Sequence, residues 1–295
     1  MIIPDQETGE EVVRDRQVGH FDEGVQKRVF GHFTMDDAEV EVLKSEWHTG
    51  RTKMVCGTDG GLKDRIGITG YVIYGATRET PLIYGYSAKL QTTDNSSSTR
   101  QELLAQLCVV YWLQHLVEVF GEPDRPIRVT LITDSQASIL MLSKMPRLIG
   151  IKDWLSPDND ITMELYQQRA QNAHSSTELV KVKSQTIEAQ DLDETYWKLN
   201  KEADELATFA RERVKSGDII ALLPTFLPGA KAMCIINGSL YTNKLKESVH
   251  AALYRDELRD FLCYKYDWTS ETFSKINWEA HEGAMAKFSG TQQVT

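Results

Sequence analysis

Apolar and polar residues alternate along this 295-residue chain with two different periods, which predict its strands and helices. Runs rich in aromatic and β-branched residues, bounded by turn-forming residues, predict strands. Apolar residues that recur every three or four positions predict helices with one buried face. Strands are expected at residues 53–58, 70–76, 81–90, 127–133 and 178–182, and helices at 98–120, 136–145, 157–173 and 199–214.

The order of these elements, three strands and then helices and strands in turn, predicts an α/β fold. A mixed five-stranded sheet flanked by helices on both faces is the natural way to bury the apolar faces. The first long helix carries its own start and stop signals. Ser98 and Gln101 form a capping-box pattern, and Gly121 ends the apolar run.

The chain is expected to divide into three segments. Residues 1–50 are polar and acid-rich, which predicts an arm with one short helix. Residues 51–216 hold the α/β elements. Residues 217–295 begin with a proline-containing linker, and their Asn-Gly pair between two apolar runs is the strongest short signal for a β-hairpin. With two helices, expected at 244–266 and 270–287, this last segment forms a small C-terminal α+β extension.

Acidic residues outnumber basic ones, 43 against 33, and the excess is concentrated near the N-terminus. Residues 1–50 hold 12 acidic and 5 basic side chains, whereas residues 51–216 hold 22 and 20. Phosphate binding needs a local basic surface and does not need a basic total. The net charge of −10 therefore does not exclude a nucleic-acid partner.

Neither a membrane nor an oxidising compartment is expected. No run of 18 or more apolar residues predicts a membrane span, and the acidic N-terminus does not resemble a signal peptide. Four cysteines without paired spacing favour reduced thiols over disulfides or a zinc site. We therefore expect an intracellular protein, cytoplasmic or nuclear, without a membrane partner.

Four carboxylates stand where the predicted elements begin or end. Asp59 and Asp134 follow two strands that would be neighbours in such a sheet, Glu102 lies in the first turn of a long helix, and Asp204 lies on the last helix. Taken singly, each is more typical of a helix cap or a solvated charge. Brought together they would repel one another, and divalent cations would remove that penalty. Oxygen-rich sites of this kind suit Mg²⁺ or Mn²⁺.

The residues around these carboxylates carry a family resemblance. The stretches are TDGG at 58–61, STRQELLA at 98–105, TDSQ at 133–136 and NKEADELA at 200–207. Together they resemble the ribonuclease H family, found in cellular enzymes and at the end of retroelement reverse transcriptases. The resemblance covers about residues 53–214. Each stretch alone is a weak signal, but the ordered set is a strong one.

The resemblance implies a ribonuclease H-like fold and cleavage of the RNA strand of an RNA–DNA hybrid with two Mg²⁺ or Mn²⁺ ions. The implied catalytic residues and metal ligands are Asp59, Glu102, Asp134 and Asp204. The implied substrate-binding residues are Gly60, Gly61, Ser98, Thr99, Arg100, Gln136 and Asn200. The residues of these stretches, together with the C-terminal extension, resemble those of retrotransposon polyproteins. This resemblance makes a reverse transcriptase polymerase domain a candidate partner.

Two departures from the family pattern bear on activity. Gln185 stands about where many members carry a loop histidine, and glutamine cannot act as a general base, so turnover would be tuned differently. The basic segment that helps some relatives grip a hybrid is reduced to Lys144, Arg147, Lys152 and Trp154.

Two other functions stay open. The fold can serve as a non-catalytic spacer or hybrid-holding module of a polymerase, but a spacer has no reason to keep four clustered carboxylates. It also occurs in integrases and junction resolvases, which the TDSQ and NKEADELA stretches disfavour. Manganese titration would separate an active site from a spacer, and hybrid, duplex RNA and branched DNA would separate the nucleases.

Overall fold

A computed structural model describes most of the chain, in two compact units, residues 1–243 and 244–295. The described residues are 29–50, 52–75, 80–91, 97–143, 156–172, 174–182, 194–223, 227, 234–236 and 239–278. The division lies after the predicted hairpin and not at the expected boundary after residue 216. The hairpin therefore belongs to the first unit.

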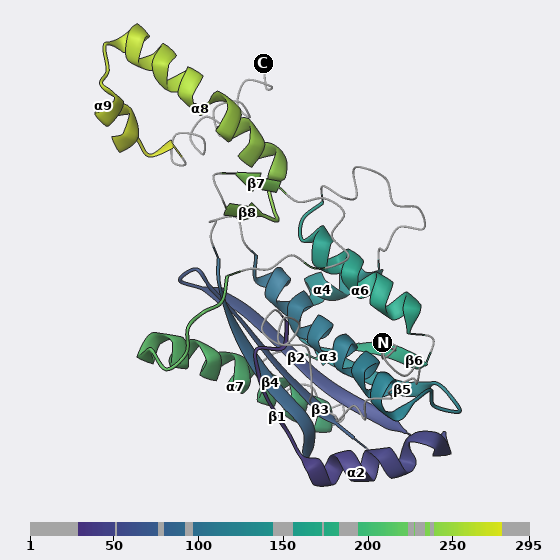
Figure 1. The fold of residues 1–295 in the computed structure, drawn as a ribbon. Helices are drawn as coiled ribbons and strands as arrows, with labels where there is room; N and C mark the ends of the chain where they lie inside the picture. The colour runs from purple at the N-terminus through teal and green to yellow at the C-terminus, as the bar shows by residue number, and fades with distance from the viewer. Residues whose placement is uncertain are drawn as a thin grey trace, which may run out of the picture. The chain divides into compact units, whose positions relative to one another are not determined.

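The first unit is built on a mixed six-stranded sheet in the order β1-β4-β3-β2-β5-β6 (Figure 1). Strands β2, β3 and β4 form the predicted antiparallel meander, and β5 and β6 extend it in parallel. The strands are β1 (His32–Met35), β2 (Lys53–Lys63), β3 (Ile66–Tyr74), β4 (Pro81–Leu90), β5 (Ile127–Thr133) and β6 (Ser175–Lys181). The predicted fold class, a mixed α/β sheet flanked by helices, is confirmed.

The sixth strand comes from the segment that was expected to be an arm. β1 pairs antiparallel with the edge strand β4, and α2 (Asp37–Glu46) follows it, with the Asp36 carboxylate accepting hydrogen bonds from two N–H groups of its first turn. Trp47 is fully buried, and its ring N–H donates to the carbonyl of Gly121 at 2.8 Å. The predictions of five strands and of a separate arm are wrong for residues 29–50. Residues 1–28 lie outside the described part.

Helices cover both faces of the sheet. α3 (Ser98–Phe120), α4 (Gln136–Ser143) and α6 (Asn159–Gln171) lie on one face, and α7 (Glu194–Ser216) lies on the other (Figure 1). Alternation along β2 divides its side chains between these layers. Cys56 packs into the core beneath α3, whereas Val55 packs with Leu199 of α7.

Two glycines allow α7 to approach the sheet closely. A Cβ on Gly57 would overlap the backbone carbonyl of Leu199, and one on Gly70 would overlap the carbonyl of Ala203. Glycine inside a strand often marks such an approach of another backbone. Both glycines therefore set the position of α7.

By length and composition, α3 is the one helix among the described residues that is apolar enough to cross a membrane. The core helix of a globular unit passes the same test. Two thirds of its most apolar window, 67%, is buried inside the fold, so the composition is weak evidence for a membrane span.

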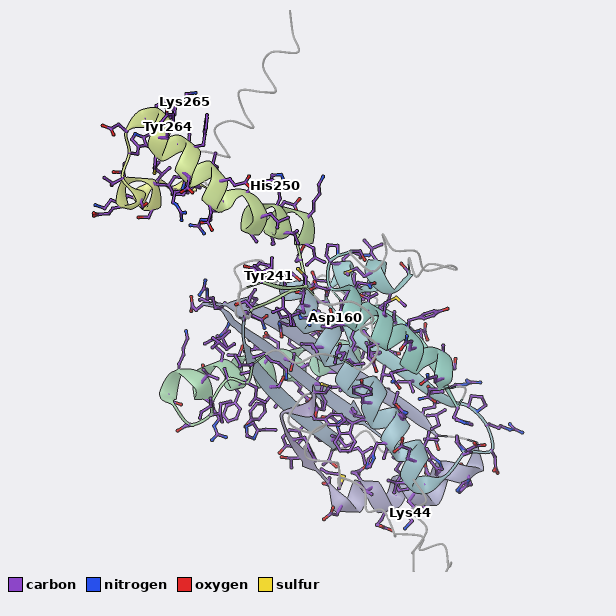
Figure 2. All side chains as sticks on the ribbon, turned by 45° about the horizontal axis from the view of Figure 1, so that its top comes forward. Lys44, Asp160, Tyr241, His250, Tyr264 and Lys265 are labelled. Atoms are coloured by element: carbon purple, nitrogen blue, oxygen red, sulfur yellow. The ribbon has the colours of Figure 1, made fainter. Side chains whose placement is uncertain are left out.

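The hairpin consists of β7 (Cys234–Ile236) and β8 (Ser239–Tyr241). Figure 2 shows Tyr241 of β8 on the same side of the first unit as Asp160, which is in the first turn of α6. The second unit, taken by itself, contains α8 (Leu245–Tyr266) and α9 (Ser270–Lys275). α9 ends well before residue 287, the expected end of this helix. Residues 279–295 lie outside the described part.

Candidate metal centre

Three of the four predicted carboxylates converge at one edge of the sheet. Asp59, Glu102 and Asp134 each offer an oxygen, and these oxygens all lie within 4.8 Å of one another. β2 and β5 are adjacent parallel strands whose register pairs Gly57 with Ile132, so Asp59 and Asp134, each two residues further along, come to the same level. β2 does not end at Asp59, as expected, but continues antiparallel to β3 as far as Lys63.

Glu102 reaches this edge because α3 begins directly against β2. A Cβ on Gly60 would overlap the backbone at Gln101 and Glu102, so only glycine permits this contact. The helix begins at Ser98, as expected, but its cap is Ser97 and not Ser98, because the Ser97 hydroxyl accepts the capping hydrogen bond from the Arg100 N–H at 3.1 Å. Glu102 then lies in the second turn and is only 7% exposed.

Asp204 does not belong to this group of three, but it is close enough for its charge to act on two of them. It is exposed on α7, and its charge contributes to raising the pKa of Asp59 and Asp134. Gly70, the strand neighbour of Asp59, is one of the two glycines at which α7 packs tightly against the sheet. The close packing of α7 therefore brings the fourth carboxylate to the same edge.

Burial and mutual repulsion disfavour the charged forms of these groups. Burial, followed by the charges of Asp134 and Asp204, raises the pKa of Asp59 to about 7. Burial and the charges of Asp59 and Asp134 raise the pKa of Glu102 to about 9, although the Thr133 hydroxyl donates to it at 3.4 Å. The pKa of Asp134 is raised for the same two reasons, and the charge of Lys181 opposes that shift only in part.

This donor set fits a divalent cation. All three converging ligands are carboxylate oxygens, which hard cations such as Mg²⁺ and Mn²⁺ prefer over the nitrogen and sulfur donors of zinc sites. A cation here would offset the repulsion that burial has made costly. Asp59, Glu102 and Asp134 can thus hold a metal, and Asp204 is placed to support it.

The predicted substrate residues lie in different environments. Ser98 and Gln136 are exposed in the first turns of α3 and α4, and Thr99 is partly exposed. Asn200 lies one turn before Asp204 on α7 and is 8% exposed. Its side-chain oxygen has no hydrogen-bond partner among the described residues, so it keeps the capacity to accept one.

Arg100 and Gly60 have structural tasks that the sequence did not indicate. Arg100 is 2% exposed, and its guanidinium is held by two carboxylates, so it is not presented to a substrate as expected. Gly60 is buried against α3, while Gly61 is partly exposed and a Cβ there would make only an ordinary contact with Ile68. The remaining residues of interest, Gln185, Lys144, Arg147, Lys152 and Trp154, lie outside the described part.

Sequence reasoning missed the residues that position the carboxylates. Gly57 and Gly70 were not singled out, although glycine within an apolar strand is itself a signal of close packing. Asp158 and Asp160 fell only within the start of the helix expected at 157–173. No local pattern reveals that both face Arg100, which precedes them by about 60 residues.

Comparison with known proteins gives fold-level likenesses. The N-terminal RNase H domain of a Mycobacterium tuberculosis protein, solved as a fusion with maltose-binding protein, is 17% identical with a TM-score of 0.35, covering 57% of this chain and 99% of that chain. LC11-RNase H1, isolated from compost by a metagenomic approach, has been solved with an RNA/DNA hybrid. It is 14% identical with a TM-score of 0.38, covering 55% of this chain and 99% of that chain. The prototype foamy virus protease-reverse transcriptase is 18% identical with a TM-score of 0.35, covering 55% of this chain and 21% of that one.

The first solved structures to match are ribonuclease H domains. No protein-family model matches the sequence, and no curated protein does. TM-scores and identities this low carry no argument about activity. Function has to be argued from the residues of this chain.

Proposed function

We propose that the first unit hydrolyses the RNA strand of RNA–DNA hybrids, with two divalent cations, Mg²⁺ or Mn²⁺, held by Asp59, Glu102, Asp134 and Asp204. One observation carries the proposal. Three mutually repelling carboxylates, Glu102 buried and Asp59 and Asp134 partly buried, converge within 4.8 Å, and they come from the stretches whose sequences resemble ribonuclease H. A fold does not keep such a cluster for stability, because each buried charge without a partner is costly.

Each side chain has a distinct part in this proposal. The charges of both Asp134 and Asp204 raise the pKa of Asp59, so we assign Asp59 as the ligand that would be shared by the two cations. Glu102 and Asp134 would complete the ligand set with it. Two cations at such a site supply the charge that activates water and offsets negative charge developing on a phosphodiester. The products would carry 5′-phosphate and 3′-hydroxyl ends, as the family resemblance implies.

Selectivity for RNA would come from groups that read the 2′-hydroxyl. The side-chain oxygen of Asn200 can accept a hydrogen bond from a hydroxyl, and Asn200 is four residues before Asp204 on the same helix. Gln136, exposed two residues after Asp134, can contact a neighbouring sugar. The resemblance to retrotransposon polyproteins adds the proposal that a reverse transcriptase polymerase domain is the natural partner.

The deciding experiment is cleavage of a hybrid labelled on either strand, with Mg²⁺ or Mn²⁺, by the wild type, Asp134→Asn and Asp124→Asn. Asp124 is exposed in a loop of the same unit, which makes its substitution a matched control for the loss of one carboxylate. We expect cleavage of the RNA strand alone, lost in Asp134→Asn and kept in Asp124→Asn.

Other outcomes would point to the alternatives. Hybrid binding without cleavage by either cation would contradict the proposal and favour a hybrid-holding module. Preference for branched DNA over the hybrid would favour a resolvase-like nuclease of the same fold.

A further inference from the structure

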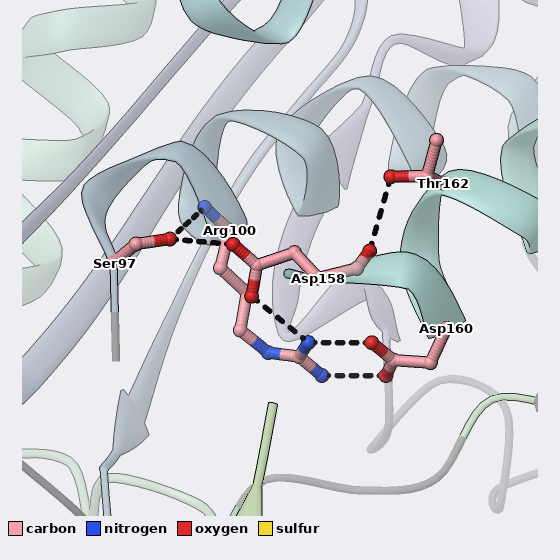
Figure 3. Close-up of polar contacts among 5 residues, drawn as sticks. All are labelled: Ser97, Arg100, Asp158, Asp160 and Thr162. Atoms are coloured by element: carbon pink, nitrogen blue, oxygen red, sulfur yellow. Dashed lines mark hydrogen bonds and ion pairs between the residues drawn. The ribbon is translucent and has the colours of Figure 1, made fainter. Parts of the chain in front are cut away.

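Arg100 and Asp158 form a buried network at the first turn of α3, the helix that carries Glu102. The Arg100 guanidinium donates to both carboxylate oxygens of Asp160, at 2.7 and 2.8 Å, and lies 3.5 Å from an oxygen of Asp158 (Figure 3). Arg100 and Asp158 are each only 2% exposed. A paired, two-pronged contact of this kind fixes the direction of an arginine side chain as well as its position.

Asp158 joins this network to the start of α3. Its second carboxylate oxygen accepts a hydrogen bond from the Ser97 hydroxyl at 2.6 Å, and that hydroxyl caps α3 by accepting from the Arg100 N–H (Figure 3). The first turn of α3 is thus held twice, by its capping residue and by its arginine. Glu102 follows Arg100 by two residues, so the turn that is held is the one leading to the metal ligand.

Asp158 also holds two other elements in place. Its carbonyl accepts from the backbone N–H and the hydroxyl of Thr162 in the first turn of α6, and its N–H donates to the carbonyl of Thr242 after β8. Its backbone lies in the left-handed region, at φ 52°, which non-glycine residues adopt only where the surroundings impose it. The hairpin, α6 and α3 therefore meet at this one residue.

We infer that Asp158 and Arg100 are positioning residues for Glu102: by tying α3 to α6 and to the hairpin, they hold the carboxylate of Glu102 against Asp59 and Asp134. This rests on the proposed function, because the positioned group is a proposed metal ligand. Partners that orient a ligand typically change metal affinity about tenfold or more when they are replaced.

The test is Mn²⁺ binding to the full chain, followed by electron paramagnetic resonance of the free ion, for Arg100→Lys and Asp158→Asn. Lysine keeps the positive charge but lacks the planar guanidinium that donates two parallel hydrogen bonds. The contact that fixes α3 is therefore weakened, while Asp158 and Asp160 still have a cation beside them. We expect Mn²⁺ affinity to fall about tenfold in each folded variant, with kcat reduced and KM for the hybrid unchanged. Arg259→Lys is the matched control, since Arg259 also binds two carboxylates, Asp256 and Asp260, on an exposed helix.

Ser97→Ala keeps the inference testable if the other variants do not fold. It removes one hydroxyl and one helix cap, and Asp36→Ala removes the cap of α2, a helix that carries none of the proposed ligands. We expect weaker Mn²⁺ binding in Ser97→Ala and unchanged binding in Asp36→Ala. If the wild type binds Mn²⁺ and the folded variants bind it equally well, this inference is wrong. If the wild type itself binds none, the proposed function fails first.

Discussion

The replacement Glu102→Gln should stabilise the metal-free protein at neutral pH. Glu102 is 7% exposed. Its burial, followed by the charges of Asp59 and Asp134, raises its pKa from 4.5 to about 9. The folded protein therefore binds a proton that the unfolded chain has released. The contribution of Glu102 to stability is therefore fully present below pH 4.5 and is lost as the pH rises toward 9, because the unfolded chain releases this proton more readily than the folded protein does.

The size of the effect follows from the same shift. Each pH unit above 4.5 costs about 1.4 kcal/mol of unfolding free energy, so at pH 7 the penalty is of the order of 3 kcal/mol. That is an upper value, since Asp59 titrates with Glu102 and shares the repulsion. Glutamine is close in shape and keeps an oxygen that can accept from the Thr133 hydroxyl, so little packing is lost.

The assay is urea unfolding in the presence of a chelator at pH 5 and pH 8, followed by tryptophan fluorescence. The wild type should lose stability between the two pH values, and Glu102→Gln should lose less and be the more stable protein at pH 8. Glu41→Gln, at an exposed position on α2, is the control and should follow the wild type. Added Mn²⁺ should narrow the difference between the two proteins, because at a concentration 100 times Kd it stabilises the wild type by about 2.7 kcal/mol. If Glu102→Gln were less stable than the wild type at pH 8 without metal, the reasoning from burial and repulsion would be refuted.

Three further substitutions test the placement of single residues. Asp204→Asn should weaken Mn²⁺ binding less than Asp59→Asn does, because Asp204 lies outside the group of three; calorimetric titration showing equal losses would contradict this. Gly70→Ala should lower the unfolding free energy by about 3 kcal/mol, because the methyl group meets the backbone of α7, whereas Gly61→Ala should change it by less than about 1 kcal/mol in the same urea titration. Trp47→Ala should cost about 3–5 kcal/mol in thermal unfolding, and a negligible loss would mean that the segment before β2 is dispensable for the fold.

The sequence predicted well wherever local pattern determines the structure. β5 was expected at 127–133 and spans Ile127–Thr133, because an apolar run between turn residues is a local signal. The meander and the long helices were found from their periods in the same way. The carboxylates could be singled out because each belongs to a short stretch of recognisable residues. The distances between their carboxylate oxygens could not be obtained from the sequence.

Other features depended on partners far along the chain. β1 has only four residues, too few for their alternation to predict a strand, and it becomes one because the edge of β4 offers it hydrogen bonds. The cap of α3 moved from Ser98 to Ser97, since Asp158, about 60 residues later, holds the Ser97 hydroxyl. The direction of Arg100 was likewise decided by Asp160.

The sequence by itself therefore determined which elements form and which acids stand at their ends, because hydrophobic period and turn chemistry act within a few residues. Only the tertiary structure decided that Asp59, Glu102 and Asp134 share one partly buried site with raised pKa values. That outcome depends on the glycine contacts at which α3 and α7 approach the sheet, and on how far burial removes water from the carboxylates. Both are properties of packed surfaces, which exist only once distant parts of the chain have met.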